Sequence, residues 1–154
     1  MKIGVISDTH NYLDPKIPEL FAGVGHILHA GDVGLPWILQ ALEQVAPVTA
    51  VSGNTDDPAL RYAPVKSLGL AGRKFFIQHI VRPQDLNDDL QQRVARERPD
   101  VVVFGHTHQR FCKSLDGVLY FNPGYAGQPK WGTERSVAIL HCGGKEIRAE
   151  YFDL

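Results

Sequence analysis

Side chains able to bind a metal ion recur directly after short apolar segments of this 154-residue chain. They are carboxylate, carboxamide and imidazole groups: Asp8, His10, Asp32, Asn54, His79, His106 and His108. Oxygen and nitrogen donors without thiolates suit Mn, Fe, Co, Ni or Zn better than Ca²⁺ or a structural zinc site built from cysteines. The set is large enough for about two cations. The sequence therefore predicts a site for two divalent transition-metal ions.

Two tripeptides, Asp8-Thr9-His10 and His106-Thr107-His108, each place two candidate ligands two residues apart. In extended backbone such side chains point to the same side, so each tripeptide is expected to act as a chelating pair. A carboxylate can bridge two cations, because each of its oxygens can bind one metal or one oxygen can bind both. Asp32 lies between the two pairs in the chain and is the predicted bridge.

Glycines precede three of the candidates, in Gly31-Asp32, Gly53-Asn54 and Gly105-His106. Glycine allows a sharp turn and the close approach of a metal or phosphate. Each candidate also has a purely structural explanation. An isolated aspartate commonly caps a helix or turn, Asn54 could occupy a left-handed turn position, and His79 could be the polar end of a strand.

Two further residues are predicted to act behind the ligands. His29 precedes Asp32 by three positions and is expected to orient a ligand, with a buried, hydrogen-bonded histidine as the alternative. Asp56 is expected to orient a ligand or a substrate water, with a simple turn residue as the alternative.

The elements that must position these residues alternate between apolar strands and helices. Strands are predicted at 3–6, 26–29, 47–51 and 101–104, a hairpin at 65–70 and 73–78, helices from an Asp14-Pro15 cap to Phe21 and over 35–45 and 84–98, and a β-meander after Gln109. This order favours a mixed α/β (α+β) fold in which helices cover mixed sheets. Ligands bind at the carboxyl ends of strands in such folds, and five strand ends here carry candidates toward one edge.

Composition excludes several classes of protein. The 16 basic and 17 acidic residues leave no positive surplus for strong nucleic-acid binding. No apolar run is long enough for a membrane span, and acidic Asp8 argues against a signal peptide. Cys112 and Cys142 form no disulfide framework and are expected to be small core residues, which favours the cytoplasm. Without repeats or linkers, residues 1–154 are predicted to form a single domain.

The ordered set Asp8-Thr9-His10, Gly31-Asp32, Gly53-Asn54, His79 and Gly105-His106-Thr107-His108 resembles the calcineurin-like metallophosphoesterase superfamily. The short chain and its Ile-Ser-Asp-Thr-His start resemble the small prokaryotic phosphodiesterases of the YfcE type, and Asn122-Pro123-Gly124 resembles a late turn of that group. The resemblance implies a sandwich of two mixed sheets flanked by helices, with a dinuclear centre at which manganese is favoured for activity. By position, one metal would be held by Asp8, His10 and His108, the other by Asn54, His79 and His106, and Asp32 would bridge them.

Three positions depart from that pattern. Thr55 stands where the wider superfamily often has a histidine that protonates the leaving group or contacts phosphate. Ile80 follows His79 where a glycine is usual, and Tyr125 stands in place of a small serine. The general acid and the shape of the pocket rim are therefore expected to differ from the family pattern.

The expected activity is hydrolysis of a small phosphoester, with a diester favoured, by in-line attack of a metal-bridging hydroxide. Asn54 would help the metals neutralise charge on the phosphoryl oxygens. The alternative is a non-catalytic scaffold of the same fold that acts through protein partners. The HxHxDH motif of metallo-β-lactamases is absent, and the late His-x-His does not fit amidohydrolases, which usually place it after the first strand. The sequence leaves the substrate, the native metal and a homo-oligomer open.

Overall fold

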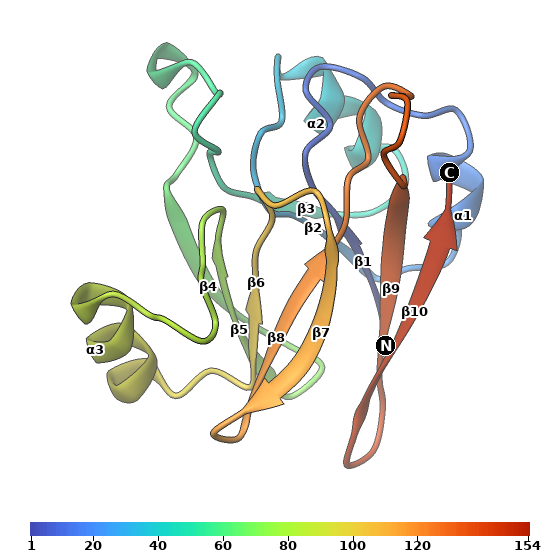
Figure 1. Ribbon diagram of the computed structural model, residues 1–154. Coiled ribbons are helices and arrows are strands. Elements are labelled where there is room, and N and C mark those ends of the chain that lie inside the picture. Colours follow the sequence, from blue (N-terminus) through green and yellow to red (C-terminus); the bar gives the residue numbers. More distant parts are fainter.

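A computed structural model describes all residues from 1 to 154 as two five-stranded sheets packed face to face (Figure 1). The first sheet has the order β10-β9-β1-β2-β3 and the second has the order β4-β5-β6-β8-β7. The strands of the first sheet are β1 (Lys2–Ile6), β2 (His26–His29), β3 (Val48–Ala50), β9 (Ser136–Cys142) and β10 (Ile147–Asp153). Those of the second are β4 (Val65–Leu70), β5 (Arg73–Gln78), β6 (Val101–Val103), β7 (Arg110–Leu115) and β8 (Val118–Pro123).

Both sheets are mixed, as the sequence predicted. In the first sheet, β1, β2 and β3 run parallel, while β9 pairs with β1 antiparallel and β10 continues from β9. In the second, β5, β6 and β8 run parallel and the outer strands β4 and β7 are antiparallel to their neighbours. The parallel strands point their carboxyl ends toward the same end of the sandwich, which is uppermost in Figure 1.

Three apolar layers hold the sandwich together. Between the sheets, residues such as Val5 and Leu28 pack against Phe75 and Val103. Their chain neighbours face outward: the first sheet packs on the helices α1 (Ile17–Leu20) and α2 (Trp37–Glu43), and the second on α3 (Asp88–Glu97). Because the central strands are covered on both faces, they read as continuous apolar runs rather than as alternating patterns.

Element boundaries depart from the predictions where capping was misjudged. The first helix begins at Ile17, because the Asp14 side chain accepts a hydrogen bond from the Lys16 amide in a turn instead of capping the helix. The third begins at Asp88, because the Asn87 side chain accepts from the Leu90 amide as a true N-cap. A short 3-10 helix, η1 (Pro58–Leu60), was not predicted.

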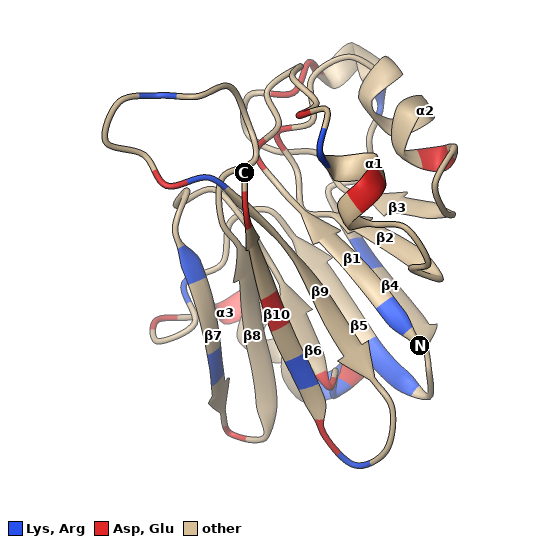
Figure 2. Cartoon of the chain, turned by 90° about the vertical axis from the view of Figure 1, so that its right-hand side faces the viewer, with Lys and Arg blue, Asp and Glu red and all other residues tan.

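Two further expectations were wrong. The C-terminal strands do not form one meander, because β7 and β8 belong to the second sheet whereas β9 and β10 complete the first. Cys142 is buried as expected, but Cys112 lies exposed on β7, an edge strand of the second sheet. No helix is long and apolar enough to cross a membrane. In the view of Figure 2, basic residues on β4, β5 and β7 are accompanied by acidic residues on α1, α2 and β10.

Candidate metal centre

The predicted ligands converge from the carboxyl ends of strands in both sheets, rather than from one sheet edge. Asp8 and His10 follow β1, Asp32 follows β2 and Asn54 follows β3. From the second sheet, His79 follows β5, and the loop after β6 carries His106 and His108. The site therefore lies where the two sheets open toward the same end of the molecule (Figure 1).

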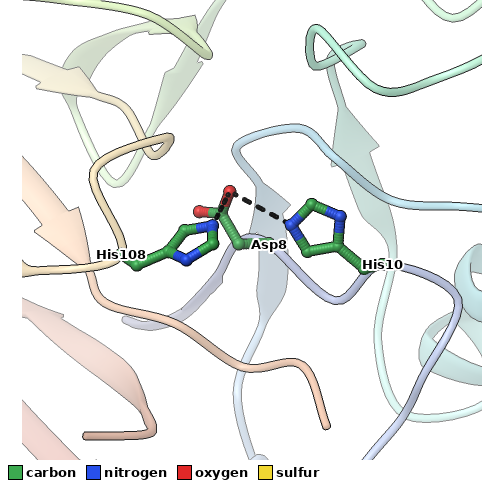
Figure 3. Close-up of side chains that lie close together, drawn as sticks. All are labelled: Asp8, His10 and His108. Carbon is green, nitrogen blue, oxygen red and sulfur yellow. Dashed lines mark ion pairs between the residues drawn. The ribbon is translucent and has the colours of Figure 1, made fainter. Parts of the chain in front are cut away.

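One compact group consists of Asp8, His10 and His108, drawn in Figure 3. The Nε2 atoms of His10 and His108 lie 3.9 and 3.4 Å from Oδ1 of Asp8, which is fully buried. About a third of each imidazole remains exposed, at 30% and 31%. The two rings meet edge to face with centroids 5.5 Å apart, so both nitrogens point toward one carboxylate from opposite sides.

The second compact group consists of Asp8, Asp32 and His79, all buried. Nε2 of His79 lies 3.2 Å from Oδ2 of Asp32 and 3.8 Å from Oδ1 of Asp8. The same Asp32 oxygen lies 3.7 Å from Nε2 of His10. Asp32 thus stands between His10 and His79, where a bridging carboxylate would have to stand.

Asn54 and His106 lie together at the outer side of the second group. Oδ1 of Asn54 is 3.0 Å from Nδ1 of His106, and the rings of His106 and His79 meet edge to face with centroids 5.4 Å apart. His106 is not within the closest clusters of donor atoms, and it is more exposed than His79.

Three buried side-chain atoms have no hydrogen-bond partner: Asp8 Oδ1, His10 Nε2 and His79 Nε2. All three lie in the two groups described above. An unpaired buried polar atom costs about 1–3 kcal/mol, so a folded protein rarely retains several in one place without a ligand for them. A divalent cation accepts lone pairs from carboxylate and imidazole alike and would satisfy these atoms. The donor set therefore fits a metal centre.

The electrostatics of the site also favour a bound cation. Burial alone raises the pKa of Asp32, but the close approach of the His79 imidazole (3.2 Å) and the hydrogen bond from the Thr55 amide (2.9 Å) lower it overall. Burial alone lowers the pKa of His79, but Asp32, Asp8 and the Ala30 carbonyl raise it overall. Nδ1 of His79 donates to that carbonyl over 2.7 Å, which directs Nε2 at the two carboxylates. The carboxylates thus favour a positive charge at this point.

The predicted extended geometry of the tripeptides was wrong. Asp8, His10, His106 and His108 all have left-handed backbone, with φ of 57°, 45°, 71° and 60°, and so has Asp32 with φ of 52°. His106 and His108 consequently point in different directions, one toward Asn54 and the other toward Asp8. Left-handed backbone is unfavourable for residues with a Cβ, and such strain gathers at functional sites.

The flanking glycines make room for side chains of neighbouring loops, whereas the sequence predicted that they make room for a metal or phosphate. A Cβ on Gly31 would come within 2.7 Å of His79 Nδ1, and one on Gly53 would collide with the Asp32 carboxylate. At Gly105, a Cβ would collide with the hydroxyl of Ser7. The loops can therefore close on one another only because these side chains are absent.

His29 and Asp56 hold the ligand-bearing loops in place through hydrogen bonds. The Gly31 amide donates to Nδ1 of buried His29, so Nε2 carries the proton and donates to Thr9 Oγ1, 2.9 Å away. Thr9 in turn donates to the Val33 carbonyl. Burial lowers the pKa of His29 to about 4, which keeps the ring neutral. His29 thereby joins the Asp8-Thr9-His10 loop to the loop that carries Asp32.

The Asp56 carboxylate accepts hydrogen bonds from three backbone amides, those of Val33, Gly34 and Gly53, at 2.8–3.1 Å. It joins the loop after β2 to the loop after β3. These contacts are with backbone, so Asp56 acts on Asp32 and Asn54 only through their chain neighbours.

Two residues that the ligand pattern did not identify support the site. Tyr125 is buried and stacks on His108, with centroids 4.6 Å apart and planes at 27°, and its centroid lies 6.3 Å from that of His10. Asn122 donates to the Gly105 carbonyl and to the Thr107 hydroxyl, which holds the loop after β6. The Asn122-Pro123-Gly124 turn was a signal for the second residue, but no local signal predicts the aromatic stack.

The other two departures from the family pattern differ in their consequences. The Thr55 hydroxyl lies 3.5 Å from Nδ1 of His10, at the open side of the site. Ile80 is 43% exposed and its side chain does not enter the cluster. The residue after His79 therefore leaves the position of that imidazole intact.

Known proteins resemble this chain in sequence. The calcineurin-like phosphoesterase superfamily domain matches residues 1–145. A probable metallophosphoesterase from Methanothermobacter thermautotrophicus is 35% identical over 97% of this chain and 91% of its own length. The phosphodiesterase YfcE from Escherichia coli K12 is 30% identical over 91% of this chain and 87% of its own.

Solved structures share the fold. An archaeal protein described as a novel phosphodiesterase superimposes with a TM-score of 0.76 at 28% identity, covering 99% of this chain and 100% of its own. Vps29 from Chaetomium thermophilum reaches a TM-score of 0.79 at 14% identity, covering 100% of this chain and 97% of its own, a likeness of fold alone. The residues matched and the relatives found show that the chain belongs to the calcineurin-like phosphoesterase superfamily.

Proposed function

We propose that this chain hydrolyses a phosphoester, preferably a diester, at a centre of two divalent cations. The observation that carries the proposal is the meeting of Asp8 Oδ1, His10 Nε2 and His79 Nε2, buried and unpaired, at the shared end of the two sheets. The membership of the superfamily supports the reaction class. The proposed site belongs to one domain spanning residues 1–154, and its cytoplasmic location stays a prediction.

The ligand assignment proposed from the resemblance is consistent with the distances. Asp8, His10 and His108 would hold one cation, and Asn54, His79 and His106 would hold the other. Asp32 would bridge, since one of its oxygens lies 3.7 Å from His10 and 3.2 Å from His79. Donors of this kind accept several metals, and we propose manganese as the activating one.

Two cations, when bound, supply an activated water and neutralise charge on the phosphoryl group. The protein supplies positioning: the Thr55 amide holds one Asp32 oxygen, and the Ala30 carbonyl fixes the ring of His79. The Asn54 carboxamide at the open side can donate to a phosphoryl oxygen, which strengthens as charge develops there. The Thr55 hydroxyl is too weak an acid to protonate a leaving group at neutral pH, so the leaving group would take its proton from solvent. Esters with good leaving groups should therefore react fastest.

The alternative function is that of a scaffold that acts by binding other proteins. The shared fold with Vps29 leaves it as a candidate, and a protein of that kind can hold a metal as well, so the metal site alone does not decide between the two functions. The two functions separate on one measurement, which is metal-dependent hydrolysis of a simple phosphodiester.

The decisive experiment compares two aspartates that share left-handed backbone. Asp8 (φ 57°) lies in the proposed centre, whereas Asp116 (φ 50°) lies in the exposed β7–β8 turn. With bis-p-nitrophenyl phosphate and Mn²⁺, Asp8→Asn should reduce kcat/KM by at least about 10³-fold, because one buried carboxylate faces all the clustered imidazoles. Asp116→Asn should leave it unchanged. Equal activity of wild type and Asp8→Asn would refute the proposed centre.

A further inference from the structure

A polar cavity of about 580 Å³ opens beside His108. It lies between the loop that follows β6 and the loop that joins β8 to β9, which projects from the sandwich in Figure 2. None of its lining side chains is hydrophobic. The cavity shares one wall, His108, with the proposed metal centre, and its volume falls within the range of small-molecule sites.

The walls offer neutral hydrogen-bonding groups. Hydroxyls come from Thr107, Thr133 and Ser136, and a carboxamide comes from Gln109. The Ser136 hydroxyl already donates to the Pro123 carbonyl and accepts from Nε of Arg110. Thr133 forms no side-chain hydrogen bond within the protein, so its hydroxyl is free to meet a ligand.

The charges of the cavity disfavour an anion. Arg110 forms an ion pair with Asp153, so its positive charge is compensated within the protein. Glu134 is exposed and has no basic partner within ion-pair distance, so the cavity carries an uncompensated negative charge. A second phosphate or a carboxylate on the ligand would therefore find no free positive partner in the lining.

We propose that this cavity binds the alcohol portion of the substrate and that this alcohol is a hydroxylated, uncharged group such as glycerol or a sugar. The inference rests on the proposed function, because it assumes that the phosphoryl group lies at the adjacent metal centre. Hydroxyl groups of a ligand can bond to the Thr133 hydroxyl and the Gln109 carboxamide, whereas an aryl group would leave these polar atoms unpaired. The cavity thus favours the binding of polyol esters, whereas the reactivity of aryl esters comes from their good leaving groups.

Thr133 provides the sharpest test, since Thr133→Val replaces one hydroxyl by a methyl of similar size. We expect it to lower kcat/KM for glycerophosphoglycerol about tenfold in the manganese-loaded chain and not to lower that for bis-p-nitrophenyl phosphate, whose aryl group makes no hydrogen bond to the hydroxyl. Thr133→Ser, which keeps the hydroxyl, should retain the wild-type ratio of the two values. Equal losses for both substrates, or no loss in Thr133→Val, would overturn the proposal.

A binding measurement separates this inference from the proposed function. Calorimetric titration with Mn²⁺ present should show that glycerol 3-phosphate binds about tenfold more tightly than inorganic phosphate, and that Thr133→Val removes the difference. Equal binding of the two by wild type would overturn the cavity assignment even if diesters are hydrolysed. Conversely, tighter binding of glycerol 3-phosphate without hydrolysis of any diester would refute the proposed function and leave the cavity assignment standing.

Discussion

The two ends of the sandwich use left-handed backbone for opposite purposes. At the hairpin end, Ala71-Gly72 and Asp116-Gly117 have positive φ in two-residue turns, where the strand pairing demands it. At the metal-site end, positive φ occurs in histidines and aspartates that do not form hairpins. At the hairpin end the left-handed residues reverse the direction of the chain, whereas at the metal-site end they orient side chains toward one another.

The environments of these residues differ as well. Asp116 is exposed to solvent, whereas Asp8 is fully buried with one oxygen unpaired. Strain combined with burial and unmet hydrogen bonds is costly at the metal-site end and is retained there. The comparison indicates that this end is shaped for a ligand at the expense of stability. Three experiments test that conclusion.

The largest effect is expected from acidification of the metal-free protein. The pKa of His29 is lowered to about 4 by burial, against about 6.5 when unfolded. Between these pH values only the unfolded chain takes up the proton, so falling pH removes about 3 kcal/mol from the free energy of unfolding, and rising pH restores it. Between pH 7 and pH 4, the free energy of unfolding of His29→Gln, measured by urea titration, should fall by about 3 kcal/mol less than that of wild type. Identical pH dependence in both proteins would show that His29 is not held neutral.

A smaller effect is expected from the aromatic stack on the first group. Tyr125→Ser removes the ring that packs on His108, so both histidines of that group gain freedom that metal binding must remove. Mn²⁺ affinity at one of two sites should fall about tenfold by calorimetry. Tyr125→Phe keeps the ring and should bind within about twofold of wild type. Unchanged affinity in the serine variant would show that the stack does not position the ligand.

The smallest effect concerns the strain itself. Ala71→Gly at the hairpin end should raise the free energy of unfolding of metal-free protein by about 0.5–1 kcal/mol, because glycine accepts positive φ. His108→Gly at the metal-site end should gain less, because it also loses the ring that stacks on Tyr125. Denaturant titrations measure both. Added Mn²⁺ should then stabilise Ala71→Gly as much as wild type but His108→Gly far less. Destabilisation by both substitutions would refute the strain that the comparison assumes.

Much of the fold could be predicted because the central strands are covered on both faces. Runs such as Val101–Val103 are apolar throughout, and they appear within about a residue of their predicted bounds. The helix starts were less predictable, since Asp14 and Asn87 are both plausible caps and only the structure decides which one faces a helix. The split of the last strands between two sheets could not be predicted, because turn signals do not specify the partner of a strand.

The candidate ligands could be named from the motifs, but their arrangement could not. The left-handed backbone of Asp8 and His108 arises from contacts between loops far apart in the sequence. The same holds for the bond from His29 to Thr9 and for the stack of Tyr125 on His108. The motifs identify the candidate ligands, whereas the direction in which each side chain points depends on packing between distant segments, which no local sequence pattern predicts.

The position of β1 has a consequence for synthesis. This strand is central in its sheet, yet its antiparallel neighbour is β9, whose residues 136–142 are translated about 130 residues later. At ribosomal rates, β1 must wait on the order of ten seconds for that neighbour. During this interval one edge of the strand is open to pairing with other nascent chains. Metal loading should therefore follow the synthesis of β9, because the loop that carries Asp8 acquires its final shape only when the sheet closes.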